Sequence, residues 1–308
     1  MGGQGQLWGD GRAFAMQVNT AQSKLKFPKL FTDTWDMDYL QGIVKAWVGP
    51  SYLAMRGSGM KTRIGESNIA GSFSLTRPDP IYEQRLALQL QVDGAEVLAA
   101  KAFVPYKIPE KLSKWLAEGP QAGQLSKIKF AYQGQVRIRP GELGRRIELE
   151  ADIAQGTVRY DPKWPVVNDF DGHVHVAGRE TRISVERANS LGLAVSDSHV
   201  VLVNNGMYAQ VDLKASGEGE QLLDFVWASP LSETLNFVTE NWRSSGSLAL
   251  SGQLLVPIRK EESPVLAVDF DFDLAGLDLE IPEYRVSPSQ LQGHGQFSLP
   301  HNLTGAFT

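Results

Sequence analysis

The chain has 308 residues, of which 42% are apolar and 21% are charged, and its formal net charge is −5. This mildly acidic balance gives no basic footprint for nucleic acid and no polybasic attraction to anionic lipid headgroups. Because the sequence contains no cysteine, disulfides and cysteine-ligated zinc sites are excluded, and no run of about 18 apolar residues predicts a membrane-spanning helix.

A short unit recurs three times along the chain. Each copy is an alternating strand, a proline, a variable connection and an apolar-x-Gly step that opens a new strand. The copies begin at residues 25, 158 and 279, and their glycines are Gly42, Gly172 and Gly293. Because repeated strand units build by stacking on their neighbours, the repeat predicts a sheet that extends sideways.

Alternation of apolar and polar residues dominates the rest of the chain. It is clearest at 86–93, 146–152, 210–214 and 266–274. Such alternation is typical of strands that have one apolar face and one wet face. We expect roughly fifteen to eighteen strands, with turns at Asp93-Gly94, Pro140-Gly141, Asp171-Gly172, Asn205-Gly206 and Ser216-Gly217.

Few segments have the spacing of a helix. The segment 109–118 has a proline in its first turn and is followed by Gly119, and 218–242 has two apolar runs separated by Ser229-Pro230. The composition of 39–48 would allow a helix, but the repeat places a strand there. We therefore predict a mainly β protein with two or three short helices that plug or cap an antiparallel sheet.

Two sets of polar residues have the composition of metal sites. His173 and His175 share one strand face, but the chain has only three further histidines to complete a zinc site. The aspartates at 269–273 lie along one straight strand, which cannot wrap a calcium ion. We interpret both sets as solvated strand faces, and we predict no metal, no cofactor and no enzyme activity.

Four segments stand out by their order and spacing. They are 104–109 with Trp115-Leu116, 160–165, 229–231 and 248–257. Together they resemble the AsmA-like envelope proteins of the YhdP type, and the repeats extend the likeness to most of the chain. The resemblance implies a long, curved antiparallel sheet that forms an open, taco-like apolar groove for phospholipid acyl chains.

The resemblance also implies where the protein works and with what. It implies a periplasmic lipid-transfer bridge between the inner and outer membranes, anchored in the inner membrane by a segment absent from this chain. The implied partners are phospholipid, the two membranes through regions outside this chain, and other envelope proteins. We expect one continuous elongated domain, a piece of a longer protein, with segments 1–100, 101–260 and 261–308.

Apolar residues on the alternating strands are the candidate lining of the groove. They are Leu86, Leu88, Leu90, Ile147, Leu149, Val174, Val176, Ile183, Val185, Val211, Leu213, Val268, Phe270 and Phe272. Without the resemblance, the same residues predict the closed core of a β-sandwich, and hence an envelope assembly or adhesion scaffold. A third hypothesis, an enzyme acting on polysaccharide, requires two carboxylates that face each other across a cleft.

Overall fold

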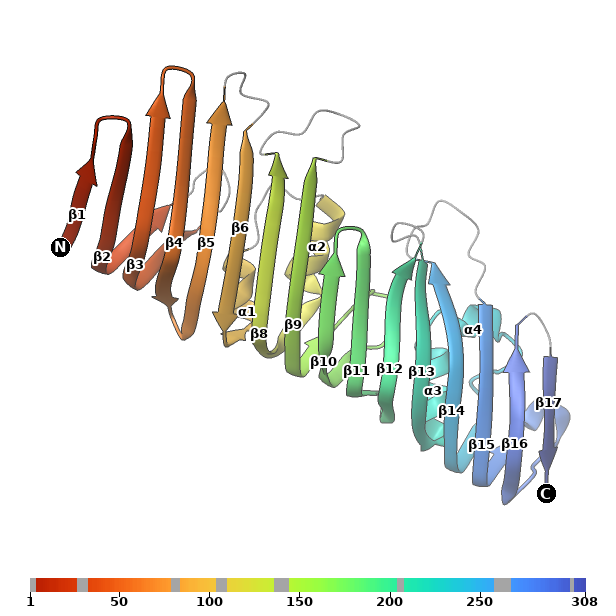
Figure 1. Ribbon diagram of the computed structural model, residues 1–308. Coiled ribbons are helices and arrows are strands. Elements are labelled where there is room, and N and C mark those ends of the chain that lie inside the picture. Colours follow the sequence, from red (N-terminus) through yellow and green to blue (C-terminus); the bar gives the residue numbers. More distant parts are fainter. Residues whose placement is uncertain are drawn as a thin grey trace. The chain divides into compact units, whose positions relative to one another are not determined.

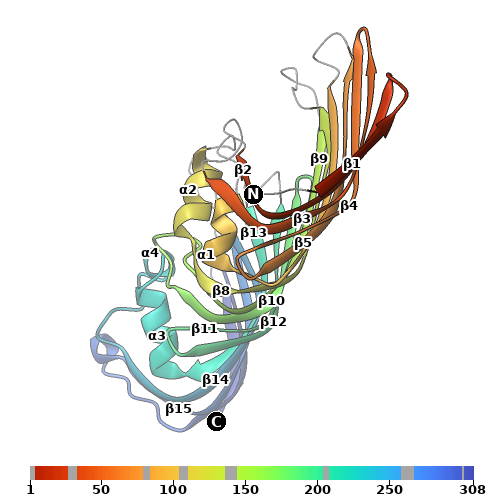
Figure 2. The same cartoon turned by 90° about the vertical axis from the view of Figure 1, so that its left-hand side faces the viewer.

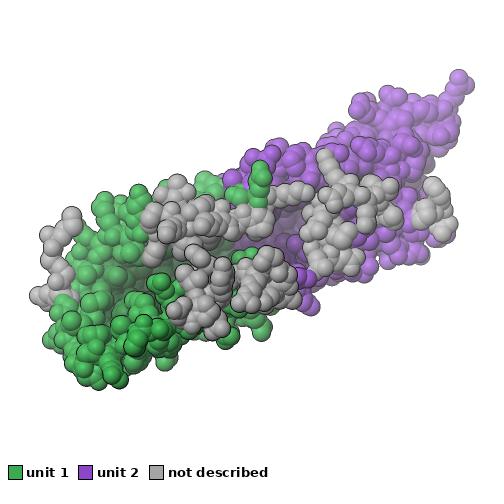
Figure 3. Space-filling model, turned by 90° about the horizontal axis from the view of Figure 1, so that it is seen from above, with its two compact units in different colours: residues 1–113, 124–152, 175–178 green, residues 114–123, 153–174, 179–308 purple. Residues whose placement is uncertain are grey.

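A computed structural model describes residues 4–26, 33–78, 84–103, 110–135, 144–203, 208–257, 267–299 and 302–308. The described strands form one open, antiparallel sheet of seventeen strands, which confirms the predicted mainly β fold (Figure 1). The chain divides into two compact units (Figure 3). Unit 1 comprises 1–113, 124–152 and 175–178, and unit 2 comprises 114–123, 153–174 and 179–308. The three-segment division expected from the sequence stays a prediction.

Unit 1 is built from neighbouring strands that follow one another in the sequence. Its strands are β1 (Gln4–Gly9), β2 (Ala13–Lys26), β3 (Thr34–Gly49), β4 (Tyr52–Ile64), β5 (Ser67–Pro78), β6 (Arg85–Asp93), β7 (Ala95–Glu96) and most of β8 (Pro120–Gln135) and β9 (Arg145–Val158). Helix α1 (Val97–Ala100), the 3₁₀ turn η2 (Lys101–Phe103) and the start of α2 (Glu110–Glu118) complete it. Each strand from β1 to β6 pairs with the next, and β8 pairs with both β6 and β7.

Unit 2 has the same sequential pairing from β11 to β17. Its elements are most of β10 (Val167–Ala177), then β11 (Glu180–Ser190), β12 (Leu193–Val203), β13 (Tyr208–Glu218), α3 (Gly219–Trp227), α4 (Leu231–Thr234), β14 (Arg243–Pro257), β15 (Ala267–Glu280), η3 (Pro282–Tyr284), β16 (Leu291–Ser298) and β17 (Asn302–Phe307). All six pairings between β11 and β17 are antiparallel.

The structure corrects two of the predicted turns and one predicted helix. Asp171-Gly172 lies inside β10 and Ser216-Gly217 lies inside β13, so neither is a turn. In the predicted helical segment 218–242, the second apolar run forms a helix that ends at Thr234. The Leu235 backbone leaves the helical conformation there, with φ −99° and ψ 43°. The predicted turns at 140–141 and 205–206 lie outside the described residues.

The glycines of the repeat lie where adjacent strands approach closely. A Cβ atom added to Gly172 would lie 2.1 Å from the backbone oxygen of Ser184, and one added to Gly293 would lie 2.0 Å from that of Ala306. At Gly42 the nearest neighbour is the Met60 side chain rather than backbone. Because a side chain at 172 or 293 would displace the neighbouring strand, glycine meets a packing requirement at these two steps rather than forming a turn.

Single residues with left-handed backbone angles interrupt many of the strands. Their φ values are positive, which marks bulges at which a strand bends and twists more strongly. They are Gln22, Gly59 and Lys127 in unit 1, and Gln155, Asp169, Asp197, Gly246 and Gly276 in unit 2. The strands of each unit bend along their length (Figure 2).

The bulge in β9 is held by Asp171. The Gln155 backbone N–H donates to Asp171 Oδ1 at 2.7 Å, and the Arg187 guanidinium donates to Asp171 Oδ2. The Gln155 hydrogen bond, with a smaller effect from Arg187, lowers the pKa of the Asp171 carboxyl below its ordinary value. One carboxylate therefore ties β9, β10 and β11 together.

The core of unit 2 lies between its sheet and α3, which Figure 2 shows against β14. Trp164, Leu254 and Val268 are buried there, and Phe225 of α3 and Leu231 of α4 pack against them. The Trp164 and Phe225 rings are 6.1 Å apart between centroids. The connection between β9 and β10 and the two helices thus cover part of the apolar face of β13–β15.

Replacing Gly172 by alanine should destabilise the protein, because the added methyl group collides with the β11 backbone. We expect Gly172→Ala to lower the free energy of unfolding by about 1–3 kcal/mol. Gly49→Ala is the matched control, since its added Cβ would have no neighbour closer than 3.7 Å. Urea unfolding is monitored by circular dichroism. Equal unfolding midpoints for the two variants would contradict the proposed packing requirement at Gly172.

Removing the Trp164 side chain should open a cavity beneath α3. We expect Trp164→Ala to cost about 3–5 kcal/mol of unfolding free energy. Tyr284→Ala serves as the control, because Tyr284 is 70% exposed and its loss should change stability by less than about 0.5 kcal/mol. A Trp164→Ala protein that unfolds at the control's urea concentration would show that this cluster is not the core of unit 2.

Candidate functional site

One face of unit 1 is apolar along rows that cross the strands. Directly paired residues of antiparallel strands point to the same face of a sheet. The longest such row runs from β1 to β8 through Leu7, Met16, Val44, Gly57, Phe73, Leu88 and Tyr132. A second row runs beside it through Phe14, Ala46, Met55, Leu75 and Leu86. We call this surface the apolar face of unit 1.

Much of the apolar face of unit 1 remains accessible. Leu7 is 70% exposed and Met16 is 42% exposed, whereas Val44, Phe73 and Leu88 are half-buried. All described strands belong to a single sheet, so the structure offers no second sheet to close a sandwich over this face. The sandwich core of the scaffold hypothesis is therefore not found in the described part of the chain.

Unit 2 has corresponding apolar rows, but its helices cover part of them. One row is Ile183, Val200, Val211, Leu254 and Val268, and the next is Leu213, Gly252, Phe270, Phe297 and Leu303. Val211 and Phe270 pack against the cluster of Trp164, Leu254 and Val268. Farther along β15, the Phe272 ring stacks on Phe307 with a centroid distance of 6.0 Å.

The fourteen predicted lining residues fall on six strands, all on the apolar side of the alternation. Leu86, Leu88 and Leu90 lie on β6, Ile147 and Leu149 on β9, Val174 and Val176 on β10, Ile183 and Val185 on β11, Val211 and Leu213 on β13, and Val268, Phe270 and Phe272 on β15. Thirteen are half-buried and Val268 is 6% exposed, while the alternate residues Gln89, Gln91, Asp269 and Asp271 are exposed. The register places Val211 with Val268 and Leu213 with Phe270 in common rows.

The sequence prediction missed the part of the apolar face that lies on β1–β5. Phe14 and Met16 alternate with Ala15 and Gln17, so the signal was present but short. Phe73 and Leu75 likewise alternate with serines. Gly57 interrupts the pattern on β4, and a Cβ atom there would lie 2.2 Å from the Phe73 ring. The ring of the neighbouring strand thus occupies the space that a side chain at 57 would need.

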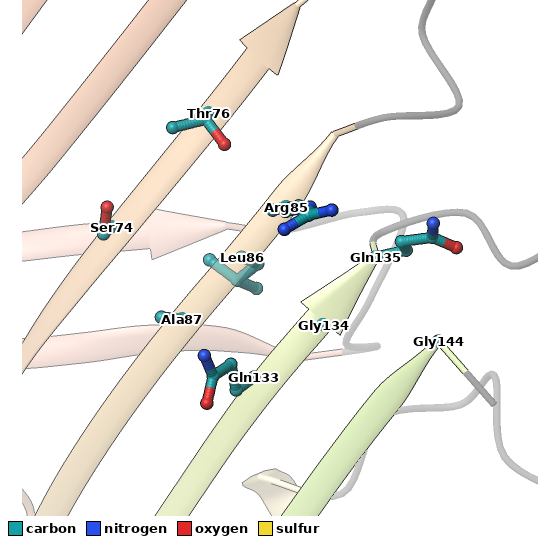
Figure 4. Close-up of a pocket in the computed structure, with 9 residues that line it drawn as sticks. All are labelled: Ser74, Thr76, Arg85, Leu86, Ala87, Gln133, Gly134, Gln135 and Gly144. Carbon is teal, nitrogen blue, oxygen red and sulfur yellow. The ribbon is translucent and has the colours of Figure 1, made fainter.

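A small hollow of about 320 Å³ lies near the ends of β5, β6 and β8 (Figure 4). Its lining is mostly polar and consists of Ser74, Thr76, Arg85, Leu86, Ala87, Gln133, Gly134, Gln135 and Gly144. Ser74, Ala87 and Gln133 are paired across the strands, and they alternate with Phe73 and Leu88. Most of the lining is therefore on the polar side of the sheet, and Leu86 is its one member from the apolar rows named above.

The residues considered as metal ligands lie apart from any larger cluster. His173 and His175 are half-buried on β10, and they alternate with Val174 and Val176. Asp269, Asp271 and Asp273 are exposed along β15, where Gln296 Nε2 donates to Asp269 Oδ1 at 3.3 Å. Among the described residues, no three His, Asp or Glu side chains gather as metal ligands would.

Two of the motifs that carried the family resemblance have clear structural roles. The segment 160–165 supplies Trp164 to the core of unit 2, and the Trp115 indole donates to the Tyr160 carbonyl at 3.0 Å. Ser229 lies between α3 and α4, where its Oγ accepts from the Leu231 N–H. The segment 104–109 lies outside the described residues.

One comparison with known proteins gave a match. The family model described as "YhdP protein" matches residues 2–294, which is most of the chain. A search of curated proteins and a search of solved structures gave no match. None of the helices in the described ranges has the length and apolarity needed to cross a bilayer. The extent of the match shows that the chain belongs to the YhdP family, as its motifs and repeats predicted.

Proposed function

We propose that this chain is a segment of a periplasmic, bridge-like lipid-transfer protein. In this proposal the apolar faces of its sheet carry phospholipid acyl chains between the inner and outer membranes. The observation that carries it is the seven-strand apolar row of unit 1, whose side chains stay partly accessible. Membership of an envelope protein family related to lipid transport supports the same conclusion.

The energetics of a hydrocarbon chain explain why such a surface suits a carrier. Burying one CH₂ group is worth about 0.8 kcal/mol, so exposing a sixteen-carbon chain to water costs on the order of 12 kcal/mol. A carrier must therefore cover the chain at every point of its path. Rows of Leu, Met, Val and Phe do this without directional bonds, so a chain moves from strand to strand with little change in free energy.

The same geometry leaves the lipid headgroup free. Polar residues such as Gln89 and Gln91 alternate with the apolar rows and point to the other face. A headgroup that stays in water needs no charged pocket within the apolar face. The proposal therefore assigns the chain a non-enzymatic role, with phospholipid as the cargo.

In this proposal the segment that anchors the protein in the inner membrane lies outside residues 1–308, as do the contacts with other envelope proteins. The lipid-carrying role of the apolar face can be tested on this chain alone.

Photo-crosslinking from the two faces of one strand tests the proposal directly. Leu88 and Gln89 are adjacent on β6 and point to opposite faces, so each serves as the control for the other. With a photoreactive amino acid at either position and radiolabelled phosphatidylethanolamine, we expect crosslinks from position 88 and almost none from 89. Equal labelling from both positions, or none from either, would count against an acyl-chain path on this face.

A charge on the apolar face should also remove bound lipid. We expect Leu88→Glu to lower the phospholipid that co-purifies with the chain by about tenfold or more, since an acyl chain would have to desolvate a carboxylate. Gln89→Glu adds the same charge to the polar face and should leave the lipid unchanged. Mass spectrometry of extracted lipid gives the readout, and circular dichroism checks that both variants are folded.

A further inference from the structure

The face of β1–β4 opposite the apolar rows carries a second exposed surface. It consists of Trp8, Ile43, Lys45, Trp47, Tyr52 and Arg56, which we call the aromatic–cationic patch. Ala15 pairs with both Trp8 and Lys45, and Lys45 pairs with Arg56. These residues alternate with Leu7, Met16 and Val44, so they point away from the apolar face.

The large side chains of this patch are exposed to solvent, whereas the alanines between them are buried. Trp8 is 50% exposed, Ile43 39%, Trp47 41% and Tyr52 48%. Ala15 and Ala54, which lie on the same face, are only 7% and 8% exposed. Four apolar or aromatic side chains on one otherwise polar face form a surface that a binding partner could cover.

The N-terminal segment that carries the patch has a formal charge opposite in sign to that of the whole chain. Residues 1–64 contain eight Lys and Arg and four Asp and Glu, a formal charge of +4, and the remaining residues carry −9. Nearby, Lys24 pairs with Asp36 and Arg63 with Asp38. Within the part of the chain that the structure describes, Lys45 and Arg56 make no ion pair. The net charge of −5 therefore conceals a cationic N-terminal segment.

We infer that the aromatic–cationic patch docks on the surface of an anionic phospholipid bilayer. Trp and Tyr have an apolar ring and a polar tip, and they settle at the level of the headgroups. Lys and Arg next to them are attracted to anionic lipids. A protein partner fits less well, because the cores of protein interfaces are depleted of Lys, whereas Lys45 lies between Ile43 and Trp47 on β3.

The polar hollow continues the patch along the same cross-strand rows. Arg56 pairs with Ser74, and Ala54 pairs with Thr76, which in turn pairs with Arg85. Ser74, Thr76 and Arg85 all line the hollow (Figure 4). A guanidinium and two hydroxyl groups that line one hollow suit a lipid phosphate, so the hollow extends the charged part of the docking surface.

Vesicle flotation with the whole chain tests this inference. We expect the chain to float with vesicles of phosphatidylglycerol and phosphatidylcholine, and much less with phosphatidylcholine alone. Lys45→Gln with Arg56→Gln should weaken this binding about 30-fold, at about 1 kcal/mol for each cation lost. Trp8→Ser with Trp47→Ser should weaken it as well. The matched controls are Lys214→Gln and Tyr284→Ser, which change exposed side chains of unit 2 and should bind like the wild type.

Other outcomes would overturn the inference. Wild-type binding by the patch variants, or equal loss in the control variants, would show that the patch does not contact the bilayer. If the patch variants differed from the wild type in the mass measured by light scattering but not in flotation, a second copy of the chain would be the partner that covers the patch. The result is separable from the proposed lipid transfer, because patch variants should keep crosslinking from position 88 while Leu88→Glu should keep vesicle binding.

Discussion

The dominant physical constraint on this molecule is the need to remove the apolar side of its sheet from water. Most strands place large hydrophobic residues on that side, and each such side chain gains about 1.5–3 kcal/mol when it leaves water. Unit 2 covers part of its share from within, because Trp164 and the helices α3 and α4 pack over Leu254 and Val268. The described residues of unit 1 leave Leu7, Phe14 and Met16 accessible. In unit 2, protein segments cover part of the apolar side. Where the apolar side of unit 1 is left accessible, a hydrocarbon chain could cover it instead, which supports the proposed function.

Local details of the backbone keep these surfaces continuous. Bulges bend the strands, and they would disrupt the ladder if they were not held in place. Asp171 holds one of them by accepting a hydrogen bond from Gln155 while it pairs with Arg187. Gly172 and Gly293 allow the next strand to pass within the distance at which a side chain would collide. Two of the three repeat glycines, Gly172 and Gly293, thus lie where the backbones of neighbouring strands approach most closely.

Much of the fold and part of the site could be predicted from the sequence, because alternation identifies strands and their apolar faces. It placed Leu86 to Leu90 and Val268 to Phe272 on the apolar side, and the repeat correctly favoured a strand over a helix at 39–48. Alternation cannot supply register, so it could not show that Leu7 and Leu88 share one row. It also could not distinguish Val268, buried under Trp164, from half-exposed residues such as Leu88. Glycine was misleading at 172 and 217, because both lie inside strands, and at 172 the close approach of the β11 backbone rather than a turn requires it.

The strictly sequential pairing of neighbouring strands has a consequence for how such a protein arises and folds. Within each unit almost every contact between strands joins segments that are close in the sequence, so the contact order is low for a β protein. A nascent chain can add one hairpin after another as it emerges, without waiting for a distant partner. Duplication of a hairpin would lengthen the sheet and leave the existing pairings unchanged.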